Sequence, residues 1–177
     1  MKTNDSIKKL VLASLFAAFT FVATLIHIHV PGMQTGYVNL GDCLVIVSAV
    51  LLGPVYGSLA GGIGSALTDF LHGYVIYVPA TFIIKTLMGI AVCFIYKLAS
   101  KDKDKYNLKV FPLILGGVFA ELIMVCGYFL YEGLFIVNFA GAALGIFGNC
   151  IQGVFGVICS ILVLKVLKKT KITDMIE

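Results

Sequence analysis

The stretch LLGPVYGSLAGGIGSALTDFLHGYVIYVPATFIIK, residues 51–85, decides the fold. It is apolar almost throughout, it contains a Gly53-Pro54 break, and it is rich in glycine, alanine and serine. Proline interrupts a helix because it has no backbone N–H to donate. Small residues let neighbouring membrane helices approach closely. The stretch therefore predicts a helix end at residue 53, a tightly packed helix after it, and a further helix from residue 79.

The composition of the whole chain is that of an integral membrane protein. Of its 177 residues, 60% are hydrophobic and 12% are charged, against roughly 45–50% and 25% in soluble domains. We predict a single all-α membrane domain over residues 1–177, with the first apolar segment retained as a helix rather than cleaved as a signal peptide. Six transmembrane helices are expected, of which the second is short, at residues 10–29, 42–53, 55–72, 79–97, 110–131 and 140–167.

Lysine placement predicts the orientation. The chain has thirteen lysines and no arginine. With six helices, all of them except Lys85 fall on one side, in segments 2–9, 97–109 and 165–171. The positive-inside rule then places both termini in the cytoplasm. We expect a multi-pass protein of the bacterial cell membrane. This bias also accounts for the net charge of +4, so no nucleic-acid partner is expected.

Asp69 and Lys85 are two of the charges that this arrangement leaves inside the membrane. Each lies a few residues from the outer end of its helix, so they share a similar depth. An ionised side chain at the bilayer centre costs about 2.5–3.5 kcal/mol on insertion scales, and is retained where it is paired or lines a cavity. A structural Asp69–Lys85 ion pair and a ligand contact by Lys85 are both compatible with the sequence.

Other polar and tyrosine side chains collect at the same outer layer. Some of the tyrosines are explained by the aromatic belt at a membrane surface. Together the side chains predict an outward-facing pocket with aromatic walls and a few orienting polar groups. The candidate substrate-binding residues are Tyr37, Asn39, Asp42, Tyr74, Tyr77, Lys85, Glu121, Tyr128 and Asn149.

No catalytic or nucleotide-binding motif accompanies this pocket. The five cysteines are widely spaced and interpreted as packing residues, and His27 and His29 are two apart, which does not favour a metal site. We expect no catalytic residue, no metal and no cofactor. The pattern favours a binding subunit that obtains its energy from other proteins. A self-contained secondary transporter and a membrane enzyme remain the rival classes.

The segment GYVNLGDCLVIVSAVLLGPVYGSLAGGIGSALTDFLHGYVIYVPATFIIKTLMG, residues 36–89, resembles the signature region of the substrate-binding S components of energy-coupling factor (ECF) vitamin transporters. The resemblance implies six helices with cytoplasmic termini. It also implies a small-molecule vitamin as ligand, and as partners a transmembrane coupling subunit (T component) with two ATP-binding cassette ATPases.

The resemblance extends to a docking surface and to the ligand. S components carry small residues four apart on the first helix, which packs on the coupling subunit, and Ala13 and Ala17 have that spacing. Ordinary packing within the bundle is the alternative. The subgroup that the sequence resembles most is associated with pyridoxine and hydroxymethylpyrimidine. We therefore expect vitamin B6 or a close pyrimidine relative, with riboflavin as the alternative.

Overall fold

The computed structural model describes residues 2–26, 28–29, 37–100 and 109–170. Five helices dominate this part of the chain, and two-residue strands β1 and β2 pair antiparallel, with Ile28 opposite Val38. The elements are α1 (Lys2–Leu25), β1 (Ile28–His29), β2 (Tyr37–Val38), α2 (Gly41–Leu71), α3 (Val78–Ser100), α4 (Val110–Phe135) and α5 (Phe139–Lys169).

All five helices are long and apolar enough to cross a membrane. The described residues therefore do not show six separate helices. The predicted second and third helices, 42–53 and 55–72, are the two halves of α2, which continues through a kink. At Gly53 the backbone is non-helical, with φ of 85°, and Pro54 follows. The left-handed φ is accessible because glycine has no side chain.

The two halves of α2 fold back on each other. In a straight helix, Val45 and Gly61 would be about 24 Å apart at 1.5 Å per residue. Here a β-carbon added to Gly61 would lie 3.0 Å from a Val45 methyl group. The Ser48 hydroxyl also donates to the Gly57 carbonyl at 2.9 Å. The kink thus forms a helical hairpin, and the first half of α2 lies inside the bundle instead of crossing the membrane on its own.

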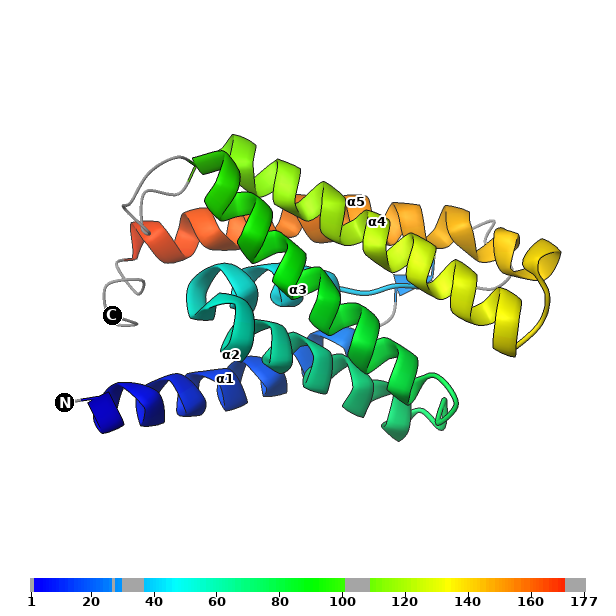
Figure 1. Cartoon of the computed structure of the whole chain (residues 1–177), viewed down its shortest axis with the longest axis horizontal. Coiled ribbons are helices and arrows are strands. Elements are labelled where there is room, and N and C mark those ends of the chain that lie inside the picture. The colour runs from blue at the N-terminus through cyan, green and yellow to red at the C-terminus, as the bar shows by residue number, and fades with distance from the viewer. Residues whose placement is uncertain (1, 27, 30–36, 101–108, 171–177) are drawn as a thin grey trace.

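The hairpin is the centre of the packing. Each helix packs on the next in the chain, and α5 returns to pack on α2 and β2. Figure 1 shows α3 crossing between the α1–α2 pair and the α4–α5 pair. The start of α1 and the end of α5 lie at the same end of the molecule, together with the end of α3 and the start of α4 (Figure 1). The turns that follow α2 and α4 lie at the opposite end.

Replacing Gly57 by alanine should destabilise the hairpin. A β-carbon at Gly57 would lie 2.1 Å from the Ser48 carbonyl oxygen and 2.7 Å from the Ala49 α-carbon, and backbone cannot move aside as a side chain can. Overpacking a core typically costs about 1–3 kcal/mol. We expect a lower thermal unfolding midpoint for Gly57→Ala in detergent. Gly145→Ala is the control, since its β-carbon makes only an ordinary 3.4 Å contact; equal melting of the two variants would contradict the hairpin packing.

Candidate functional site

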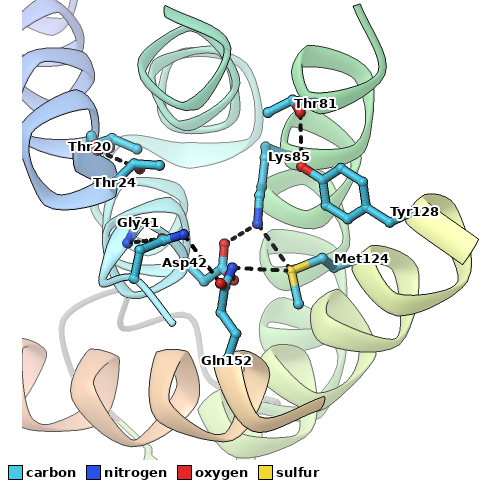
Figure 2. Close-up of polar contacts among 10 residues, drawn as sticks. Thr20, Thr24, Gly41, Asp42, Thr81, Lys85, Met124, Tyr128 and Gln152 are labelled. Carbon is cyan, nitrogen blue, oxygen red and sulfur yellow. Dashed lines mark hydrogen bonds and ion pairs between the residues drawn. The ribbon is translucent and has the colours of Figure 1, made fainter. Parts of the chain in front are cut away.

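A buried ion pair joins α2 to α3. The Lys85 ammonium binds the Asp42 carboxylate, and the side chains are 5% and 0% exposed. Lys85 also contacts the Met124 sulfur at 3.1 Å and lies 5.7 Å from the centre of the Tyr128 ring. Figure 2 shows that these side chains converge from α2, α3 and α4, with Gln152 entering from α5. Four helices therefore meet at one charged pair.

A chain of hydrogen bonds ends on the Asp42 carboxylate. Lys85 binds one carboxylate oxygen, and the Gln152 amide donates to the other at 2.7 Å. The Gln152 oxygen accepts from the Asn39 amide at 3.2 Å, and the Asn39 oxygen accepts from the Gly41 N–H at 2.8 Å. Because both carboxylate oxygens have partners, the cost of burying this charge is offset.

Asp42, rather than Asp69, is the ion-pair partner of Lys85, which corrects the expected Asp69–Lys85 pair. Asp42 occupies the first turn of α2, where the partial positive charge of a helix N-terminus favours a carboxylate. Asp69 is in the last turn of the same helix and lies beside Thr81, one helical turn from Lys85. The hairpin brings the start of α2 to the level of Lys85, which a separate spanning helix would not do.

Helices α3 and α4 are joined by three side-chain contacts at regular spacing. Lys85 contacts Met124, and the Thr81 hydroxyl is 2.9 Å from the Tyr128 hydroxyl. One turn further along, the Tyr77 hydroxyl donates to Glu132 at 3.4 Å. Thr81 and Lys85 of α3 follow Tyr77, which immediately precedes that helix, at intervals of four residues, and Met124, Tyr128 and Glu132 have the same spacing on α4, so each set shares one face. Burial and the Glu132 carboxylate raise the pKa of Tyr77 to about 12, which keeps its hydroxyl protonated at neutral pH.

A cavity of about 430 Å³ lies above the ion pair. Polar and tyrosine side chains from all five helices and from the turn after α2 line it: Thr24, Asn39, Ser65, Asp69, Tyr74, Tyr77, Thr81, Lys85, Tyr128, Glu132, Asn149 and Gln152. Its volume falls within the roughly 300–1,000 Å³ of small-molecule sites. The arrangement offers aromatic surface, hydroxyls, amides, one ammonium and two carboxylates, and suits binding of a small polar ring.

Most of the predicted binding residues line this cavity. Those that do are Asn39, Tyr74, Tyr77, Lys85, Tyr128 and Asn149. Asp42 lies behind Lys85 and does not line it, and neither does Glu121. The side chain of Tyr37 lies outside the described residues. Sequence reasoning missed Thr81 and Glu132, which the spacing of four residues from Lys85 and Tyr128 would have indicated. It also missed Thr24 and Ser65, for which the only signal is a hydroxyl in an apolar segment.

Glu121 is not among the cavity-lining residues, and it lies close to Asp42 where both approach Gly156. It is 7% exposed, and neither carboxylate oxygen has a hydrogen-bond partner among the described residues. Gly156 on α5 provides the room, because a β-carbon there would lie 2.9 Å from Glu121 and 2.8 Å from Asp42. The residue therefore belongs to the buried polar centre rather than to the cavity wall.

A second hollow, of about 760 Å³, lies between α1 and α2 and is almost wholly apolar. Ala13 and Ala17 both line it, as does the exposed Ala18. Ala13 is also part of the core, and a β-carbon on Gly64 of α2 would lie 2.4 Å from the Ala17 carbonyl oxygen. The small residues of α1 thus bring α1 close to α2 inside the bundle, and they also border an apolar groove.

Breaking the ion pair should destabilise the protein more than neutralising Asp69. Removing one member of a buried pair typically costs about 3–5 kcal/mol, because it strands the other charge. We expect this loss for Asp42→Asn, and recovery of most of it in the double variant Asp42→Asn/Lys85→Met. Asp69→Asn is the matched control. Melting followed by circular dichroism in detergent measures all three, and the pairing is refuted if Asp69→Asn loses as much stability as Asp42→Asn.

Comparison with known proteins agrees with the geometry of a small-molecule site in a membrane bundle. A chain from Pyrococcus woesei, described as an uncharacterized protein in gap 3'region, is 34% identical over 141 residues, which cover 80% of this chain and 88% of that one. The thiamine precursor transporter HmpT of Lactococcus lactis subsp. cremoris (strain MG1363) is 26% identical over 172 residues, or 97% and 94% of the two chains. The family model of the ECF-type riboflavin transporter S component matches residues 4–169. The chain therefore belongs to this family of membrane-integral S components, and is a transport protein rather than an enzyme.

Proposed function

We propose that this protein is the substrate-binding subunit of an ECF-type vitamin importer, and that it binds a small aromatic heterocycle in the cavity above Lys85. The observation that carries this proposal is the combination of a cavity of about 430 Å³, tyrosines Tyr74, Tyr77 and Tyr128 on its walls, and a buried ammonium in its floor. Aromatic side chains stack on a planar ring, and the polar groups fix its orientation.

Vitamin B6 or a hydroxymethylpyrimidine is the ligand that we propose. Both are single rings with hydroxyl groups and ring nitrogens, and a ligand oxygen or nitrogen can accept a hydrogen bond from Lys85. The relative named as a thiamine precursor transporter supports a compound of this size. Riboflavin, the ligand in the name of the family model, is the second candidate.

The helix ends suggest the orientation. The end of α3, the start of α4 and the end of α5 lie at the end of the molecule where α1 begins (Figure 1). Lysines occur at these helix ends: Lys97 in the last turn of α3, Lys109 immediately before α4, and Lys168 and Lys169 in the last turn of α5. By the positive-inside rule we place this end, and both termini, in the cytoplasm. The turn after α2, which contributes Tyr74 and Tyr77 to the cavity, then faces outward, as does the turn after α4. The cavity receives the vitamin from outside, and transport is completed with a T component and two ATP-binding cassette ATPases.

The apolar groove between α1 and α2 is our candidate for the contact with the T component. Ala13 and Ala17 supply small side chains on its floor, and the surrounding leucines and phenylalanines supply apolar surface. A helix of another membrane protein can lie closely on such a surface. The groove and the cavity have no lining residue in common, so docking and ligand binding use different residues.

The purified chain should bind its vitamin without any partner and should not accumulate it. We expect saturable binding of pyridoxine or the hydroxymethyl-aminopyrimidine by titration calorimetry in detergent, and no accumulation in liposomes that contain this chain alone. Mass spectrometry of small molecules that copurify with the chain gives an independent identification. Sustained accumulation by the chain alone would instead indicate a secondary transporter, and turnover of the compound would indicate an enzyme.

Filling the groove should block uptake but not binding. Ala18 lines the groove and is exposed, so Ala18→Leu adds bulk there without disturbing the core. We expect loss of vitamin uptake in cells that depend on this chain, with the dissociation constant of the purified variant within about twofold of wild type because the cavity is untouched. Ala143→Leu is the matched control, since Ala143 is exposed on α5 and outside the groove. Normal uptake by Ala18→Leu would refute docking at this groove.

A further inference from the structure

We propose that Asp69 and Glu132 determine the specificity of the cavity, and that they select a ligand that carries an amino group or another strong N–H donor. This inference rests on the proposed function and narrows it. Among vitamin-like rings it favours an amino-substituted ring over its hydroxyl counterpart, and it disfavours ligands with a phosphate or carboxylate group.

The first argument is the balance of charge on the cavity wall. The charged residues among the lining are Lys85, Asp69 and Glu132. Lys85 is already neutralised by Asp42, which lies behind it. Two carboxylates therefore remain without a basic residue of their own among the lining residues. His72, which is near Asp69, is exposed and does not line the cavity.

The second argument is the position of the two carboxylates on their helices. Asp69 lies in the last turn of α2, which ends at Leu71, and Glu132 lies in the last turn of α4, which ends at Phe135. Neither last turn contains a basic residue. A helix C-terminus carries partial negative charge and normally favours cations. Two carboxylates and two helix C-termini thus give this end of the cavity a negative potential that a cationic or N–H-rich ligand would offset.

The third argument is a buried hydroxyl without a partner. Ser65 is 1% exposed, lines the cavity, and its Oγ has no hydrogen-bond partner among the described residues. It is four residues from Asp69, on the same face of α2. An unsatisfied buried polar group is costly, typically about 1–3 kcal/mol, and native proteins seldom leave one. A bound polar ligand that reaches Asp69 would also supply the partner for Ser65.

Lys85, at the floor of the cavity, favours a hydrogen-bond acceptor of the ligand rather than a donor. An ammonium group has three N–H donors, and Asp42 and Met124 take two of those of Lys85. The third is suited to an acceptor atom of the ligand. The cavity therefore favours a ring with two different ends, an acceptor end placed at Lys85 and a donor end placed between Asp69 and Glu132.

Titration calorimetry with matched ligand pairs tests this inference on the purified full chain. The pairs are pyridoxamine with pyridoxine, and the hydroxymethyl-aminopyrimidine with the same ring bearing hydroxyl in place of the amino group. We expect the amino member of at least one pair to bind about tenfold to a hundredfold more tightly, the range for a hydrogen bond to a charged group. Glu132→Gln and Asp69→Asn should each reduce this preference, because the affinity for the amino member falls more than the affinity for the hydroxyl member. Glu132→Asp keeps the charge and should keep most of the preference.

The outcomes separate the inference from the proposed function. Equal affinity for both members of each pair in the wild-type protein would overturn the inference and leave the proposed function standing. Full preference retained in Glu132→Gln and Asp69→Asn would overturn it as well. If none of these ligands and no riboflavin binds, the proposed function itself fails. Melting followed by circular dichroism in detergent reports correct folding of each variant, and Glu132→Gln decides the test if Asp69→Asn does not fold.

Discussion

The Asp42–Lys85 ion pair is the interaction on which the arrangement of the helices depends. It places a full positive and a full negative charge in the interior of an apolar bundle, where each alone would be expensive. The helices must therefore hold the two groups together and supply the remaining hydrogen bonds. Gln152 of α5 and Met124 of α4 do so, and Asn39 extends the network to the start of α2. Helices far apart in the sequence are thus fixed at one depth.

This requirement explains the unusual form of α2. For Asp42 to meet Lys85 at the level of the bundle interior, α2 must begin inside the protein, and the chain must then reverse to continue the helix. The Gly53-Pro54 kink provides the reversal, and the absence of a side chain at Gly57 lets the two halves touch. The same reversal places the start of α2, with Asp42 in its first turn, at the ion pair, and it places the end of α2, with Asp69, at the cavity. One helix therefore presents a carboxylate in a favourable field at Asp42 and another in an unfavourable field at Asp69.

Local features were predictable from the sequence, and long-range pairings were not. The membrane class, the break at Gly53 and half of the cavity lining follow from composition, from proline chemistry and from polar side chains in apolar segments. The partner of Lys85 does not, because Asp42 and Asp69 are both acidic residues near helix ends, and only the hairpin decides which one reaches the ammonium. The helix count failed for the same reason, since a length rule treats 42–53 as a separate span. Glu121 was expected in the pocket because a membrane carboxylate usually marks a site, but depth along α4 does not reveal which face it occupies.

The contacts between α3 and α4 weaken from the floor of the cavity to its mouth. At the floor Lys85 combines an ion pair with its contact to Met124. In the middle two neutral hydroxyls meet at 2.9 Å, and near the mouth the Tyr77–Glu132 hydrogen bond lengthens to 3.4 Å with a half-buried donor. Hydrogen bonds lose strength as they lengthen and as water gains access. Opening near the mouth breaks the long Tyr77–Glu132 contact and the hydrogen bond from the Tyr131 hydroxyl to the Ile76 carbonyl, whereas opening at the floor breaks a buried ion pair. A binding protein needs this gradient, because the groups that admit the ligand must move while the groups that orient it stay fixed.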